Sequence, residues 1–401
     1  MTATALAEPL VLCAAPLIDS KRQHGGMRLV ISGRANSFDL EQALKSITET
    51  AADDKSPLIV AITAADMLSK LAAWARPPQA VIEIKAAWLA AASVREWLAQ
   101  SKTPWSLNGS PANPIDPALM ATLHSVVSAT HSKETTKLGK PVIYTDAADF
   151  AAVDAAFAAG IRWVAGWPLV NHALVMKYAA AAPDNKTSNT ANNTRLKANK
   201  ASVMRLLQLA NADADIEKLE AILKQDATLA FRLLRYINSA ALGLPVQVNS
   251  FQHAVMILGY KRMIRWLSLL LMDGSSAEPN HTPIMRICLR RGFFMERLAP
   301  LFGEGMSGDE LFITGLFSLL DVVFGQPFSA LMDQLHLPET IADSLIDNGE
   351  PYGPILQLAK AIEVGDSDTA RMQAELLGLD QGEVNLALLN AIKDTAALDL
   401  G

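Results

Sequence analysis

A short basic run with one aromatic residue is the first candidate for chemistry in this chain. Lys261, Arg262, Arg265 and Trp266 occur together, and on a helix residues four apart share a face, so the two pairs 261/265 and 262/266 are neighbours. Two interpretations are open. The cluster forms a surface for an anionic ligand or a protein partner, or Arg265 covers the Trp266 ring or meets an acidic neighbour.

A second basic series follows on the next predicted helix. Arg286, Arg290, Arg291 and Arg297 form a broken stripe at helical spacing, with Glu296 nearby. Charged residues in such a stripe are typical of a helix face exposed to solvent, and that is the prediction for this segment.

Residues that build metal or nucleophile sites are few and scattered. Cys13 and Cys288 are far apart and belong to no Cys/His pattern, so they are predicted to be buried thiols of a reducing compartment. The three histidines of the second half, His253, His281 and His336, lack metal-ligand spacing. No metal site and no cofactor are predicted.

Composition narrows the class of protein. Half of the 401 residues are apolar and 19% are charged, which is typical of a globular protein long enough for two domains. The net charge of −6 argues against a nucleic-acid binder. The N-terminus lacks a basic region and Glu8-Pro9 interrupts its apolar stretch, and no apolar run approaches the roughly 18 residues of a membrane span. We therefore expect a cytoplasmic protein.

The elements that would position these residues differ between the two halves of the chain. Up to about residue 170, short β-like runs alternate with Ala-rich helical segments, which predicts a parallel α/β barrel, shorter than the roughly 250 residues of a complete one. The predicted strands are Leu10–Ile18, Met27–Ser32, Leu58–Thr63, Ala80–Ile84, Trp105–Asn108, Leu123–Val127, Pro141–Thr145 and Trp163–Trp167.

A polar segment separates this half from an all-helical one. Residues 183–195 are rich in Asn and Thr and show no apolar face, which predicts a linker. The predicted organisation is therefore a barrel over 1–182, a linker over 183–195 and an all-α domain over 196–401. Within the last, Trp266 is expected in the core, with Gly259 allowing another helix to approach closely.

The helical half resembles the HDOD domain, an all-helical bacterial signalling module related to HD-family phosphohydrolases but lacking their metal ligands. The resemblance rests on the runs 226–243 and 258–271, and on 311–321 followed by 325–327 and 349–354. Ser318 and Leu319 stand where the related hydrolases are expected to carry a His-Asp dipeptide. Neither side chain can serve as a metal ligand, so the resemblance implies no hydrolytic centre here.

The first half resembles a degenerate EAL domain, the barrel family that hydrolyses cyclic di-GMP. Arg28 stands where the family has a glutamate ligand, and Tyr144 stands where another is expected. The strand ending in Asn108 would normally end in paired aspartates. Glu83, Asn108 and Asp146 are the positions that could retain part of the ligand site, and the resemblance implies that catalysis is lost.

The combined expectation is an EAL–HDOD type of bacterial signalling protein that is not an enzyme and acts by binding a protein partner. Lys261, Arg262 and Arg265 are the candidate partner surface. The main alternative is a sensor whose barrel binds a cyclic dinucleotide without cleaving it. A third is a weak cyclic di-GMP phosphodiesterase. No membrane and no nucleic-acid partner are expected.

Overall fold

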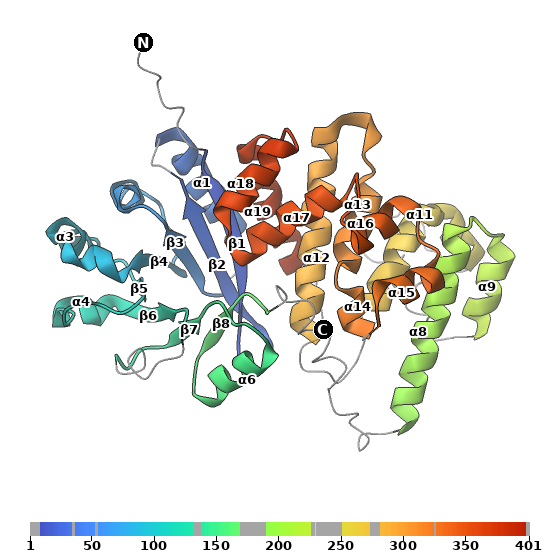
Figure 1. The fold of residues 1–401 in the computed structure, drawn as a ribbon, viewed down its shortest axis with the longest axis horizontal. Helices are drawn as coiled ribbons and strands as arrows, with labels where there is room; N and C mark the ends of the chain where they lie inside the picture. Colours follow the sequence, from blue (N-terminus) through green and yellow to red (C-terminus); the bar gives the residue numbers. More distant parts are fainter. Residues whose placement is uncertain are drawn as a thin grey trace, which may run out of the picture.

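The computed structural model describes residues 9–33, 37–52, 55–130, 138–168, 190–225, 229, 251–272, 281–324 and 326–397. Its first half is a closed eight-stranded barrel (Figure 1). All eight strands predicted from the sequence are present, with ends within three residues of those expected. They are β1 (Val11–Ile18), β2 (His24–Ser32), β3 (Leu58–Ile62), β4 (Ala80–Lys85), β5 (Trp105–Asn108), β6 (Leu123–Ser128), β7 (Val142–Tyr144) and β8 (Trp163–Ala165).

The prediction of a parallel sheet is correct for β2 to β8 and wrong for β1. β1 runs antiparallel to both of its neighbours, β2 and β8. The cause is local, because a short turn joins β1 to β2, whereas a parallel connection needs a crossover long enough for a helix. β1 meets β8 at only two register positions, Leu17 with Ala165 and Ile18 with Val164, so the barrel closes along a short seam.

Helices cover the outer face of the barrel. Asp116 and Asp149 begin two of them, since each carboxylate accepts a hydrogen bond from a backbone N–H of the first turn. The helices of this half are α1 (Ser37–Thr50), α2 (Leu68–Leu71), α3 (Ala92–Ser101), α4 (Pro117–Thr122) and α6 (Phe150–Ala158), with short 3₁₀ turns at η1 (Ala65–Met67) and η2 (Ala86–Ala90).

The second half is helical, as predicted. Its elements are α8 (Thr190–Asn211), α9 (Ile216–Gln225), α11 (Phe251–Met272), α12 (His281–Leu298), η4 (Ala299–Gly305), α13 (Gly308–Phe317), α14 (Leu320–Phe324), α15 (Phe328–Leu335), α16 (Glu339–Ile346), α17 (Gly353–Val364), α18 (Ser367–Leu376) and α19 (Gln381–Ala397). α8 begins at Thr190, inside the range predicted as linker, and residues 183–189 lie outside the described residues.

Two glycines let α12 and α13 cross closely at the centre of this half. A Cβ on Gly315 would lie 2.6 Å from the backbone nitrogen of Gly292, and a Cβ on Gly292 would lie 2.9 Å from the carbonyl oxygen of Phe312. Gly259 has a different role from the one predicted. A Cβ there would meet nothing within 4 Å, and its φ of 69° kinks α11 instead of admitting a neighbouring helix.

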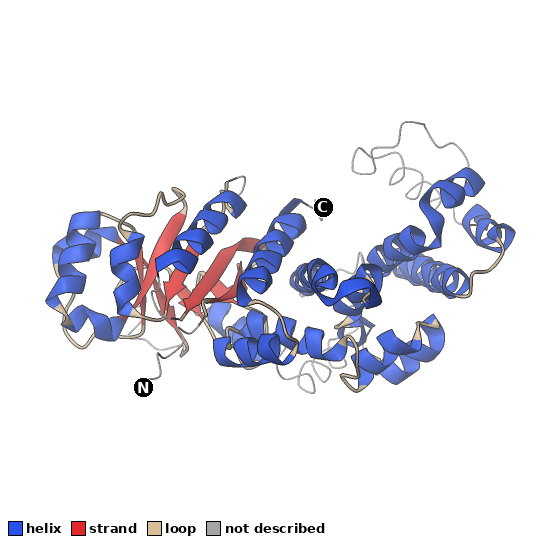
Figure 2. Ribbon diagram, turned by 90° about the horizontal axis from the view of Figure 1, so that it is seen from above, coloured by secondary structure: helices blue, strands red, loops and turns tan. Residues whose placement is uncertain are grey.

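The last three helices join the two halves. α17, α18 and α19 all pack against β1, and Figure 1 shows them beside the strands of the barrel. Figure 2, from above, shows the strands on one side of the molecule and helices alone on the other. The Asn385 side chain of α19 accepts a hydrogen bond from the Leu12 backbone N–H (2.9 Å) and donates one to the Leu10 carbonyl oxygen (2.7 Å). The amide thus bonds β1 backbone groups much as a neighbouring strand would.

Among the described residues, no helix combines the length and the apolarity that a membrane-spanning segment needs.

Candidate functional site

The interior of the barrel holds a polar centre built by three strands. Glu83 on β4 is 2% exposed and accepts hydrogen bonds from Arg28 on β2, with Nε–Oε2 at 2.7 Å and Nη2–Oε1 at 2.6 Å. Asn108 at the end of β5 donates a third bond to Glu83 Oε1 at 2.6 Å. Successive strand residues point to opposite faces, so these side chains face inward while Ile82, Ile84 and Leu107 pack in the core outside.

Electrostatics stabilise this pair in its charged form. Burial acts to lower the pKa of Arg28, but the charge and hydrogen bonds of Glu83, with a contribution from Asp146, raise it above its ordinary value. A divalent cation at Glu83 would therefore meet a fixed positive charge, and both carboxylate oxygens are already engaged. Across the described residues, no group of three or more His, Cys, Asp or Glu side chains is arranged to hold a metal ion.

The three barrel positions singled out from the sequence do not form one site. Glu83 and Asn108 are brought together, whereas Asp146 follows β7 with a φ of 57° and its carboxylate accepts a bond from the Thr145 hydroxyl at 3.2 Å. Asp146 instead lines a cavity between the two halves, whose wall Arg28 also reaches but Glu83 and Asn108 do not.

A second polar centre lies in the helical half, around the position of the missing His-Asp dipeptide. Arg291 on α12 donates from Nε and Nη2 to the Glu363 carboxylate on α17, at 2.7 to 3.0 Å. Its Nη1 donates to the Ser318 hydroxyl at 2.9 Å. Ser318 and Leu319 are buried. An arginine thus occupies the space beside Ser318.

The prediction of a solvated face on α12 is wrong for two of its four arginines. Arg290 and Arg291 are 5% and 4% exposed, because α12 packs among the helices α13, α17 and α19 and because Arg290 reaches Met27 of the barrel. Arg297, near the end of the same helix, is about half exposed and pairs with Asp394 at 2.7 Å. The apolar sequence around Arg290 and Arg291, ICLRRGFF, was the signal that could have indicated burial.

A cavity of about 680 Å³ lies between the two halves. The barrel contributes parts of β1 and β2 and the segments that follow β7 and β8. The helical half contributes residues of α12, α17 and α18, including Arg290, Arg291 and Lys360. Burial, and secondarily the charge of Arg291, lower the pKa of Lys360 to about 8.

The two cysteines are free and buried, as predicted. Burial raises the pKa of the Cys13 thiol to about 12, and burial likewise raises that of Cys288 to about 12. Neither is an activated nucleophile, because the thiolate is the reactive form.

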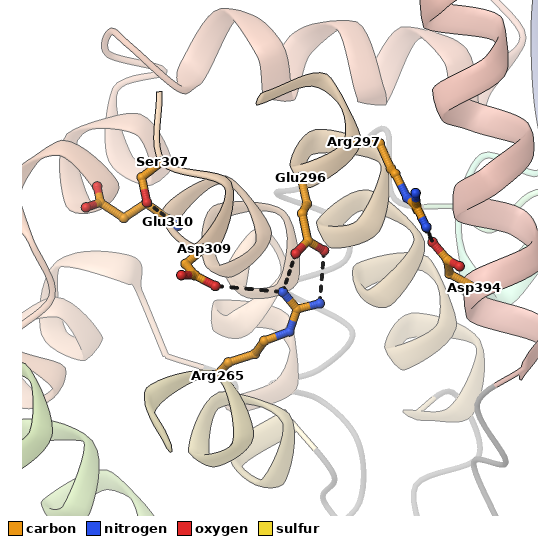
Figure 3. Close-up of polar contacts among 7 residues, drawn as sticks. All are labelled: Arg265, Glu296, Arg297, Ser307, Asp309, Glu310 and Asp394. Atoms are coloured by element: carbon orange, nitrogen blue, oxygen red, sulfur yellow. Dashed lines mark hydrogen bonds and ion pairs between the residues drawn. The ribbon is translucent and has the colours of Figure 1, made fainter. Parts of the chain in front are cut away.

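The basic cluster of α11 divides into a partly buried residue, Arg265, whose contacts Figure 3 shows, and two exposed residues. Arg265 binds both oxygens of Glu296 on α12, at 2.5 and 2.9 Å, lies 3.9 Å from Asp309 and stacks on the Phe312 ring at 3.6 Å. Lys261 and Arg262 are exposed. Trp266 is 4% exposed, which confirms its predicted place in the core. The structure favours an internal role for Arg265, while the partner surface stays a prediction for Lys261 and Arg262.

Comparison with known proteins identifies part of the helical half. The HDOD domain profile matches residues 196–331. The cyclic di-GMP phosphodiesterase CdgJ of Vibrio cholerae serotype O1 is 25% identical over 185 residues, covering 46% of this chain and 42% of that protein. The uncharacterized protein YuxH of Bacillus subtilis is 26% identical over 166 residues, covering 41% and 40%. The chain thus spans about two fifths of the length of both curated relatives.

Among solved structures, the chain is similar to one in the manganese and cyclic di-GMP complex of Klebsiella pneumoniae BlrP1. That likeness has a TM-score of 0.30 and 14% identity, and covers 42% of this chain and 58% of the other. Such values carry no argument about fold or activity. The eight-stranded barrel fits an EAL domain loosely, and that assignment stays a prediction. The match of the helical half is specific, and residues 196–331 of this chain form an HDOD domain.

Proposed function

We propose that this chain is a non-catalytic signalling protein in cyclic di-GMP-related regulation, and that it acts by binding a protein partner. The name of CdgJ supports the signalling context, and the HDOD domain supports the class of protein. Both halves would act as one regulatory unit, because α17, α18 and α19 of the helical half pack on β1 of the barrel.

One observation carries the non-catalytic part of the proposal. The Glu83 carboxylate, which would be a metal ligand in an active barrel of this type, is bound by Arg28 through two nitrogens and by Asn108 through a third. Hydrolysis of a phosphodiester by a metal-activated water needs carboxylates free to hold the metal. The corresponding place in the helical half is filled by Arg291 and Ser318.

Hydrolysis is tested directly. The purified full chain is incubated with cyclic di-GMP and either Mg²⁺ or Mn²⁺, and the linear product is separated by chromatography. We expect no product above the level in protein-free buffer. Turnover that requires added metal and disappears in Glu83→Gln would contradict the proposal and favour the weak phosphodiesterase.

Partner binding is tested through the exposed part of the basic cluster. In the native host, the double variant Lys261→Glu/Arg262→Glu should lose a protein that co-purifies with the wild-type chain after cross-linking. Lys45→Glu, an exposed lysine on α1 of the barrel, is the matched control and should retain that protein. Equal recovery from all three would exclude this surface.

A further inference from the structure

Arg290 is a buried cation whose hydrogen-bonding groups are not used by the protein around it. Within the described residues, its Nε and Nη2 have no hydrogen-bond partner, and Nη1 meets only the Met27 sulfur, at 3.6 Å. A thioether is a weak acceptor. A guanidinium removed from water without an ion-paired, hydrogen-bonded anion is a costly arrangement, so Arg290 has donors left for a further partner.

The acids that line the cavity form no ion pair or hydrogen bond with Arg290, and their carboxylate oxygens accept bonds from other groups. Glu363 is bound by Arg291 through two nitrogens. Asp366 caps α18, accepting from the Thr369 backbone N–H at 3.0 Å and from its hydroxyl at 2.7 Å. Asp146 accepts from the Thr145 hydroxyl.

A second cation and a second unused donor line the same cavity. Lys360 on α17 forms no ion pair with an acid in the part of the chain that is described, and it lines the cavity together with Arg291. Across the cavity, Trp167 follows β8, and its buried indole Nε1 also lacks a hydrogen-bond partner among the described residues. Residues with unpaired donors from both halves therefore line one cavity.

We infer that this cavity binds a phosphate-bearing ligand, with Arg290 and Lys360 as its anion contacts and Trp167 as a donor from the barrel. A guanidinium fork and an ammonium match the several oxygens of a phosphate. The volume of about 680 Å³ lies within the range of roughly 300–1,000 Å³ typical of small-molecule sites. Since its contacts come from both halves, the ligand would bridge barrel and helices. The inference goes beyond the proposed function, which needs no small ligand.

The test measures binding to the intact chain by titration calorimetry and thermal melting at low salt. Two probes separate the sources of the phosphate: inorganic pyrophosphate and cyclic di-GMP. We expect at least one probe to bind the wild type and raise its Tm, and Arg290→Gln to weaken that binding at least tenfold. Without ligand, Arg290→Gln should melt at or above the wild-type temperature, because an unpaired buried charge is removed.

Arg297→Gln is the control, since Arg297 lies on the same helix but pairs with Asp394 away from the cavity; it should bind like the wild type. Binding of cyclic di-GMP alone would identify a cyclic dinucleotide as the source, and binding of pyrophosphate alone a simpler phosphate. Failure of both probes to bind, or wild-type affinity in Arg290→Gln, would overturn the inference. Should Arg290→Gln fail to fold, Lys360→Met decides: unchanged affinity overturns the inference, and weakened affinity supports it. Neither result bears on the hydrolysis and partner tests.

Discussion

The barrel and the helical half each contain an arginine that binds a glutamate through two nitrogens, and the surroundings of the two pairs differ. In the barrel, Glu83 is 2% exposed and receives a third bond from Asn108, so the centre is completed by residues of its own strands. In the helical half, Glu363 is 13% exposed and lies on a cavity wall with Arg290 and Lys360, neither of which forms an ion pair among the described residues. Arg28 reaches the wall of the same cavity but Glu83 does not, so the first carboxylate is shielded and its centre is internally neutral. The second centre has its carboxylate on the cavity wall and cationic capacity left for a ligand.

The largest expected loss of stability comes from removing the cation of the barrel centre. Arg28→Met leaves the Glu83 carboxylate buried without its cation, which should lower the free energy of unfolding by about 3–5 kcal/mol. Urea denaturation followed by circular dichroism measures the loss. The double variant Arg28→Met/Glu83→Met should regain most of it, because no charge is then left unpaired. A single variant as stable as the wild type would mean that the barrel centre is open to solvent.

The helical half should depend on apolar packing to a similar degree. Trp266→Ala removes a side chain that is 4% exposed and leaves a cavity, so the free energy of unfolding should fall by about 3–5 kcal/mol. Arg262→Ala, on the exposed face of the same helix, should leave it nearly unchanged. If Trp266→Ala melts like the wild type but loses a partner, the aromatic ring is a recognition residue and its place in the core is wrong.

A smaller loss in the free energy of unfolding is expected from removing the cation of the helical centre. Arg291→Met also removes the cation from a glutamate, but Glu363 lies on the wall of a cavity that water can enter. The expected loss is about 1–3 kcal/mol, less than for Arg28→Met in the same urea titration. A loss equal to or greater than that of Arg28→Met would mean that Glu363 is as well shielded from water as Glu83.

The smallest expected effect is a pH-dependent change in stability caused by Lys360. Here the substitution raises the stability, whereas the three substitutions above lower it. Lys360 has a folded-state pKa of about 8 against an ordinary value of 10.5, chiefly because of burial. At pH 7 the amine is charged in both the folded and the unfolded state, so the folded state bears the full cost of burying the ammonium charge. Between pH 8 and 10.5 the unfolded chain keeps a proton that the folded chain has lost, so the wild type gains stability as pH rises through this window.

Lys360→Met lacks this dependence. It should therefore melt a few degrees above the wild type at pH 7, and the difference should shrink as pH approaches 10. Melting curves of both proteins across this range test the prediction. A difference in Tm between the two proteins that stays constant with pH would mean that burial does not lower the pKa of Lys360. The second centre would then have no unpaired positive charge at this position.

The sequence alone determined the features that depend on local pattern. Alternation of β-like and Ala-rich segments predicted all eight strands, because side-chain period and turn residues are encoded over short stretches. The runs around Trp266 predicted the HDOD domain. The departures at Arg28 and Asn108 predicted that Glu83 would lose its acidic neighbours, and the structure adds that those two residues bind it directly.

Only the tertiary structure decided which charged residues are buried and which elements meet across the two halves. Arg290 belongs to a helical stripe that looks solvated in the sequence, yet it lies at the interface of the two halves. For Arg265 the sequence left both a partner surface and an acidic neighbour open, and the structure pairs it with Glu296 against the Phe312 ring. The contact of Asn385 with β1 joins residues more than 370 positions apart. Such burial depends on long-range packing, which period and composition do not record, and the cavity exists only because the two halves pack together.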